Sequence, residues 1–158
     1  MPRWRSAISK PADRVTSAPE QVLADLDATP DRLAAAASGA DPASPAPGEW
    51  TPADIVRHLI AVEREVWHPR LAQLAAENHP FWSWAEPDRW IGEPDASLDE
   101  LLATHRRDRS VTVGTLSALD PAGWARTGTH ATYGVLNVAE LMAKAVDHDD
   151  EHIRSLER

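Results

Sequence analysis

Three helix-start signals, each followed by apolar residues at helical spacing, constrain the fold of this chain more than any other feature. Each signal joins a capping side chain to an acid three residues later, at Thr51/Asp54, Ser97/Glu100 and Asn137/Glu140. Such pairs satisfy the free backbone N–H groups at a helix start. With a fourth apolar stretch beginning at Pro19, the periodicity predicts helices near 18–38, 51–75, 97–119 and 137–156. No strand alternation of useful length is visible, so residues 18–158 are predicted to form an all-α four-helix bundle.

Prolines and connecting segments modify this outline. Pro30 predicts a kink in the first helix, and Pro69 predicts an end or bend of the second helix near His68. The connection between helices two and three, 77–96, holds three prolines and three tryptophans and follows neither period. A loop of this length is usually functional or ordered by its own side chains. Residues 1–17 lack periodicity and are expected to form a flexible N-terminal arm.

The composition excludes several classes of protein. The chain has no cysteine, which rules out disulfides, thiolate ligands and a cysteine nucleophile. Its net charge of −9, from 25 acids and 16 bases, disfavours nucleic-acid binding without a basic patch, and none is visible. No apolar run reaches the roughly 18 residues that cross a bilayer. Because no secretory signal is visible either, we expect a cytoplasmic location and no membrane partner.

The histidines carry the strongest chemical signal in the chain. His148 and His152 are four residues apart, so one helix face presents two imidazoles that can share a metal ion. That face continues the apolar stripe of Leu141 and Ala145, and His58 occupies the equivalent inner stripe of helix two. The spacing therefore predicts a three-histidine metal site between two facing helices. Three hydrogen-bonded core histidines are equally compatible with this spacing.

Residues around this group are candidates for supporting roles. Asp149 and Glu151 flank the histidine pair, and either is expected to orient a ligand imidazole by hydrogen bonding. His105 is interpreted as a core residue, the alternative being a fourth metal ligand that closes a structural site. For His130, a place at a pocket rim and a plain loop position are both open. Arg109 is predicted to form a structural ion pair rather than to bind substrate.

The tryptophans of the long connection have two interpretations. Trp82, Trp84 and Trp90 are candidates for covering a pocket, because exposed indoles need an apolar wall or a ligand. The alternative is that they merely close one end of the bundle. His68 and His79 are expected to lie at the surface.

Three stretches of the chain resemble the DinB-like superfamily of bacterial four-helix proteins. They are PGEWTPADIVRHL at 47–59, the TGTH and YG positions of 127–134, and HDDEHI at 148–153. The resemblance covers roughly residues 18–156. It implies a bundle that holds a divalent metal, often zinc or nickel, through His58, His148 and His152.

The resemblance also implies a range of activities. Family members with known chemistry include thiol-dependent transferases and isomerases that use mycothiol, bacillithiol or glutathione, and members are commonly homodimers. The sequence therefore predicts a metal-dependent enzyme acting on a small molecule, either a transferase with a diffusible thiol cosubstrate or a hydrolase. The alternatives are a non-catalytic, stress-related dimeric bundle that binds a metal or a small molecule, and a metal-free interaction module.

Overall fold

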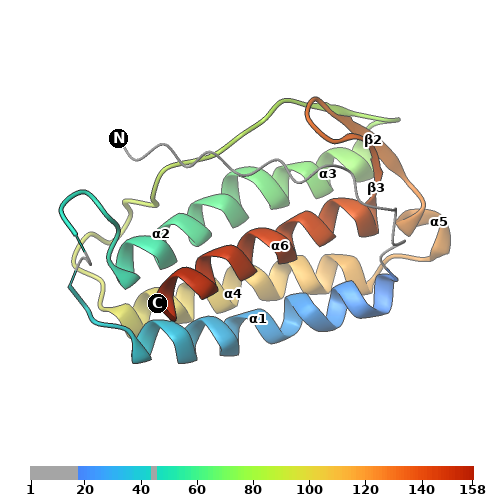
Figure 1. Ribbon diagram of the computed structural model, residues 1–158. Coiled ribbons are helices and arrows are strands. Elements are labelled where there is room, and N and C mark those ends of the chain that lie inside the picture. Colours follow the sequence, from blue (N-terminus) through green and yellow to red (C-terminus); the bar gives the residue numbers. More distant parts are fainter. Residues whose placement is uncertain (1–17, 44–45) are drawn as a thin grey trace.

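Four long helical rods make up most of the molecule (Figure 1). The computed structural model describes residues 18–43 and 46–158, so the predicted N-terminal arm of residues 1–17 lies outside the described residues. The rods are α1 (Pro19–Gly39), α2 (Pro52–Val62) continued by η1 (Glu63–Trp67) and α3 (His68–Ala76), α4 (Leu98–Ser117) and α6 (Val138–Leu156). The predicted four-helix bundle is confirmed.

The predicted helix starts at the second, third and fourth rods are all present. Thr51, Ser97 and Asn137 are the N-caps of α2, α4 and α6, and each accepts a hydrogen bond from the backbone N–H three residues later. In each case the acid at that third position bonds back to the cap, completing a capping box. Local chemistry therefore fixes where these three helices begin.

Neither of the two prolines ends its helix. The helix α1 runs through Pro30 without interruption. At Pro69 the predicted helix end is wrong, because the rod passes from η1 directly into α3. The segment η1 is π-helical, and the His68 N–H donates to the Glu63 carbonyl five residues earlier. This wider turn precedes the proline, whose ring would otherwise crowd the carbonyl of Glu65.

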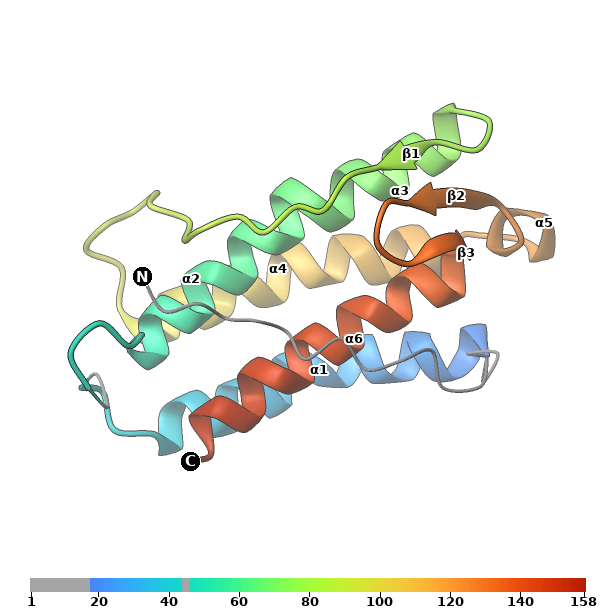
Figure 2. The same cartoon turned by 45° about the horizontal axis from the view of Figure 1, so that its top comes forward.

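A small sheet lies at one end of the bundle, where the sequence analysis found no strand. Its strands are β1 (Phe81–Trp82), β2 (Thr127–His130) and β3 (Gly134–Asn137). The strand β2 pairs parallel to β1 and antiparallel to β3. Figure 2 shows the sheet beside α3, with β3 leading directly into α6. Strands of two to four residues are too short to display an alternating pattern, so periodicity did not reveal them.

The second connector is also more ordered than the sequence indicated. It contains the short helix α5 (Pro121–Trp124), whose N-cap Asp120 accepts a hydrogen bond from the Gly123 N–H. Two apolar clusters form the core, one around Leu141 and Met142 and the other around Leu59 and Leu101. Within residues 18–43 and 46–158, no helix combines the length and the apolar character that crossing a bilayer requires.

Candidate metal centre and its pocket

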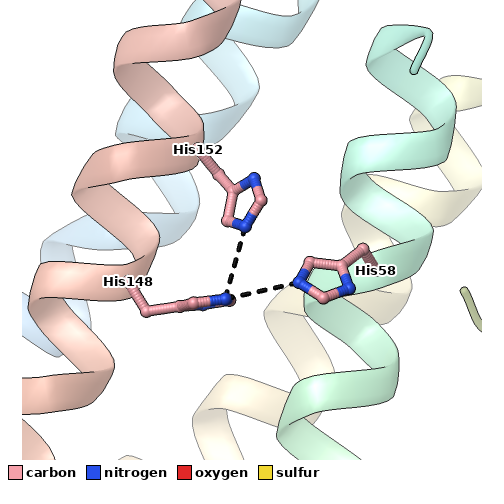
Figure 3. A group of neighbouring side chains, drawn as sticks. All are labelled: His58, His148 and His152. Carbon is pink, nitrogen blue, oxygen red and sulfur yellow. Dashed lines mark hydrogen bonds between the residues drawn. The ribbon is translucent and has the colours of Figure 1, made fainter. Parts of the chain in front are cut away.

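Three histidines from two helices converge inside the bundle (Figure 3). His58 comes from α2, and His148 and His152 come from successive turns of α6. The Nε2 atom of His148 lies 3.3 Å from the Nε2 atoms of both His58 and His152. One nitrogen of each ring lies within 4.8 Å of the others. The structure thus brings together the three residues that the helical spacing predicted.

The protonation of these rings suits metal ligation. Burial, reinforced by the neighbouring imidazoles, lowers the pKa of His148 to about 4 and that of His152 to about 3. His58 Nδ1 lies 2.9 Å from the carbonyl oxygen of Asp88. Since a carbonyl only accepts, this nitrogen carries the proton and His58 Nε2 presents its lone pair to the cluster. The site therefore offers neutral imidazoles, the form that binds a divalent metal.

Hydrogen bonding among the three rings cannot satisfy all of them. His58 Nε2 has no proton to give, and His148 Nε2 can donate only one. His148 Nδ1, on the other side of its ring, is also buried and has no partner among the described residues, with or without a metal on Nε2. Buried polar atoms normally have partners, so the cluster is incomplete as a set of core histidines. A cation shared by the three Nε2 atoms satisfies them together, and the residues fit a metal ion.

Two supporting contacts of the cluster escaped the sequence analysis. The Asp88 carbonyl that orients His58 belongs to the long connection, so this loop has a role at the site. Trp50 packs against His58 with ring centroids 5.0 Å apart and stacks on His152 at 6.5 Å. Trp50 lies within the family-like stretch 47–59, and this position could have indicated its role at the site. A backbone carbonyl such as that of Asp88 has no sequence signature.

The two acids that flank the histidine pair do not orient an imidazole, contrary to the prediction. Asp149 is fully buried on another side of α6 and accepts a hydrogen bond from Arg109 at 2.8 Å. Glu151 is exposed and lines the mouth of the adjoining pocket. Successive residues of a helix point about 100° apart, which directs the Asp149 side chain away from the ligand face.

Arg109 forms the structural ion pair that was predicted for it. Its guanidinium donates to both oxygens of Glu63, at 3.0 and 3.1 Å, and to Asp149. Burial alone raises the pKa of Glu63, but Arg109 and the Thr112 hydroxyl outweigh it and hold the pKa below its usual value. For Asp149, burial dominates and raises the pKa to about 6, with Arg109 offsetting part of the effect. This cluster is closed and satisfied by its own members.

His105 is a core residue and does not join the three-histidine group. It is fully buried on α4, and neither ring nitrogen has a partner among the described residues. Burial, with Arg109 nearby, lowers the pKa of His105 to about 4 and keeps the ring neutral. The metal-binding group found in the described part of the chain contains His58, His148 and His152 but not His105.

A pocket adjoins the three histidines and reaches toward the sheet. A water-sized sphere can occupy about 100 Å³ of it, and the rest of the hollow is open to solvent. Aromatic and cationic side chains share its walls, and these include Trp50, Trp67, Trp84, Tyr133, Arg70 and Lys144. His130, buried on β2, is also part of the wall, which favours the first of its two interpretations. Concave, mostly apolar sites with a few polar groups are typical of small-molecule binding.

The tryptophans of the connection divide between core and pocket. Trp84 is half exposed and lines the pocket, as one interpretation of it had proposed. Trp82 is instead a core residue that lies outside the pocket wall and donates from Nε1 to Gln73. The Trp82 ring packs directly against Gly128. A Cβ atom at position 128 would lie only 2.4 Å from this ring, so the absence of a side chain there allows the packing. Trp90 packs beneath the guanidinium of Arg64, away from the pocket.

Comparisons with known proteins agree with this architecture. No curated protein sequence matches the chain. Among solved structures, YfiT from Bacillus subtilis is similar with a TM-score of 0.72 and 20% identity, covering 95% of this chain and 92% of its own. It is described as a probable metal-dependent hydrolase with an unusual four-helix bundle topology. The four-helix bundle protein TT2238 is similar with a TM-score of 0.63 and 26% identity, covering 89% of this chain and 98% of its own.

The family assignment follows from the sequence match and the bundle together. The model of the DinB superfamily matches residues 25–156, which contain all three histidines of the cluster. The chain therefore belongs to the DinB superfamily.

Proposed function

We propose that this protein is a divalent-metal-dependent enzyme that acts on a small molecule. The observation that carries the proposal is the convergence of three imidazoles at a pocket with aromatic walls. A site with three protein ligands keeps coordination positions for substrate, whereas structural sites are usually closed by a fourth ligand. His105, the residue considered for that fourth place, is not part of the group.

The chain's own residues prepare the site in two ways. The Asp88 carbonyl fixes the tautomer of His58, and Trp50 holds the rings of His58 and His152 in place from one side. No carboxylate belongs to the three-histidine group of the described residues, so a bound dication keeps its full charge. Such a cation supplies a Lewis acid that polarises an oxygen of the substrate or favours the thiolate form of a sulfur ligand.

The reaction we propose is hydrolysis or a thiol-dependent transfer. The description of YfiT as a probable hydrolase supports the first, and the resemblance to thiol-using family members supports the second. The chain contains no cysteine, so a transfer reaction uses a diffusible thiol as cosubstrate. Zinc and nickel are the proposed metals, because both accept imidazole ligands. A homodimer, as is common in the family, remains part of the proposal.

Metal loading of purified protein tests the site directly. We expect wild-type protein dialysed against zinc or nickel to retain one metal ion per chain, measured by elemental analysis. His148→Ala should lose tight binding, because two imidazoles cannot complete the group. His68→Ala, in which a histidine bonded to the Asp108 carbonyl is removed, is the matched control and should load like wild type. Wild type that retains no metal, or His148→Ala that binds as tightly, refutes the proposal.

A further inference from the structure

Arg70 is a buried cation without an acidic partner among the described residues. It is 7% exposed, and its guanidinium lies over the rings of Trp67 and Trp82 at 5.7 and 5.8 Å. Its one hydrogen bond to the described part of the chain runs from Nη2 to the Ser83 carbonyl, at 3.0 Å. The guanidinium carries five N–H donors, so most of its donors have no partner here.

The free donors of Arg70 are accessible from the pocket, because none of its nitrogens is among the fully buried polar atoms that lack a partner. A buried charge is normally paired, because its removal from water costs free energy that only an opposite charge or several hydrogen bonds offset. Arg109 in the same protein shows the usual solution, with two carboxylates on one guanidinium. Arg70 differs in a second respect, since it lines the pocket that contains the three histidines.

His130 adds a second donor to the same end of the pocket. Its Nδ1 accepts a hydrogen bond from the Thr132 N–H at 3.1 Å, which places the proton of the neutral ring on Nε2. Burial, with Arg70 nearby, lowers the pKa of His130, so the ring stays neutral at pH 7. Lys144, 4.9 Å from the centre of the Tyr133 ring, also lines the wall, but its Nζ atom is paired with the Asp147 carboxylate at 3.9 Å.

The acids of the pocket do not neutralise this end. Glu86 and Glu151 belong to the wall, but both are exposed. Neither is within ion-pair distance of Arg70 in the described structure. Water screens these exposed carboxylates, whereas Arg70 is 7% exposed and forms no ion pair with the described residues, so its guanidinium is available to an anionic group of a ligand.

We propose that the pocket binds an elongated small molecule with an apolar middle and one anionic end, a carboxylate or a phosphate ester, which Arg70 and His130 hold. This inference rests on the proposed function, because it names the substrate class of the same site. His58 and Arg70 are twelve residues apart on one rod, about 18 Å at ~1.5 Å per residue. Val62 and Val66 line the wall between them. The anionic end therefore lies at Arg70 and the reacting end at the three histidines.

Matched probes that differ only in charge test the proposal. Isothermal titration calorimetry compares 4-phenylbutyrate, 4-phenylbutyl phosphate and the neutral 4-phenylbutyramide on the purified, metal-loaded protein. Charge-assisted hydrogen bonds to a buried guanidinium predict that an anion binds on the order of tenfold to a hundredfold more tightly than the amide. The tighter of the two anions identifies the natural head group as carboxylate or phosphate.

Two variants assign the preference to Arg70. Arg70→Met keeps the length of the side chain and should bind all three probes equally, while Arg70→Lys keeps the charge and should retain part of the preference. Arg106→Met, which removes an exposed arginine paired with Asp31, is the control and should behave as wild type. Circular dichroism confirms that each variant is folded, and Arg70→Lys covers the case in which Arg70→Met does not fold.

The outcomes separate this proposal from the metal site. In His148→Ala the preference for the anion should persist, because Arg70 is intact. A wild type that binds anion and amide equally overturns the inference, as does a preference that survives Arg70→Met. A preference lost in His148→Ala but kept in Arg70→Met also overturns it, since the anion then binds at the histidines. None of these results depends on catalytic turnover.

Discussion

Two buried polar regions lie close together in this bundle, and they differ in how completely their members satisfy one another. Around Arg109, two carboxylates and a backbone carbonyl accept hydrogen bonds from one guanidinium, and the Thr112 hydroxyl donates to one of those carboxylates. Around the three histidines, by contrast, ring nitrogens converge without enough partners, and Arg70, at the other end of the adjoining pocket, has one hydrogen bond to the described residues. A closed set of polar groups stabilises and specifies a fold, while an open set points to a ligand from outside. The comparison therefore separates structural from functional residues without reference to sequence similarity.

Breaking the closed cluster should have the largest effect on stability. Arg109→Met leaves Glu63 and Asp149 buried without their cation, and the loss of one partner of a buried ion pair costs about 3–5 kcal/mol. Urea unfolding monitored by circular dichroism measures this loss. Arg106→Met removes an exposed ion pair and should change the free energy of unfolding by less than about 1 kcal/mol. Equal effects of the two substitutions would contradict the distinction.

Completing the open cluster should stabilise the protein. Zinc or nickel at a free concentration about 100 times its dissociation constant should raise the free energy of unfolding by about 2.7 kcal/mol, because only the folded state presents the assembled site. Thermal unfolding with and without metal measures the rise. In His148→Ala the metal-dependent rise should vanish. If metal stabilises wild type and His148→Ala alike, it binds somewhere other than this cluster.

His105, which is buried near the closed cluster but not bonded to it, makes the fold sensitive to acid. In the folded protein its pKa is about 4, while an unfolded histidine has a pKa near ~6.5. Between these values the unfolded state binds one more proton at His105, so stability falls as the pH falls, by up to about 1.4 kcal/mol per pH unit. His105→Leu should lower the slope of unfolding free energy against pH between about 4 and 6.5, while the contributions of His148 and His152, whose pKa values are also lowered, remain. An unchanged slope would mean that His105 is not buried and neutral.

His105→Leu also has an expected outcome at neutral pH. Both ring nitrogens are buried without partners in the described structure, so their removal should leave stability at pH 7 unchanged or higher. Chemical denaturation at pH 7 checks this. A loss of several kcal/mol would show that the ring has a hydrogen-bond partner that stabilises the fold.

The smallest effect is expected at the pocket mouth. Trp84 is 49% exposed, so Trp84→Ala should change the free energy of unfolding by no more than about 0.5 kcal/mol. The same substitution should weaken binding of 4-phenylbutyrate, because the indole is part of the pocket wall. Calorimetry and urea unfolding of one preparation measure both quantities. A large loss of stability would place Trp84 in the core, as Trp82 is.

The helices and the convergence of the three histidines follow from local patterns in the amino-acid sequence. A capping box involves residues three positions apart, and an apolar helical face repeats every three to four residues. Both patterns are local, so the helix starts at Thr51, Ser97 and Asn137 can be predicted from the sequence. The spacing of His148 and His152 places both on one face by the same geometry. His58 lies on the apolar face of its own helix. Packing of this face against the apolar face of the last helix is enough to bring His58 to the other two histidines.

The side chains that complete the two polar regions could be identified only from the packing of the folded chain. Arg109 meets Glu63 across 46 positions of sequence and Asp149 across 40, and the Asp88 carbonyl reaches His58 across 30. The same holds for Trp82 and Trp84, two residues apart, of which one enters the core and the other lines the pocket. Partners so distant along the chain leave no local period or motif, because packing of whole helices, rather than any short-range preference, brings them into contact.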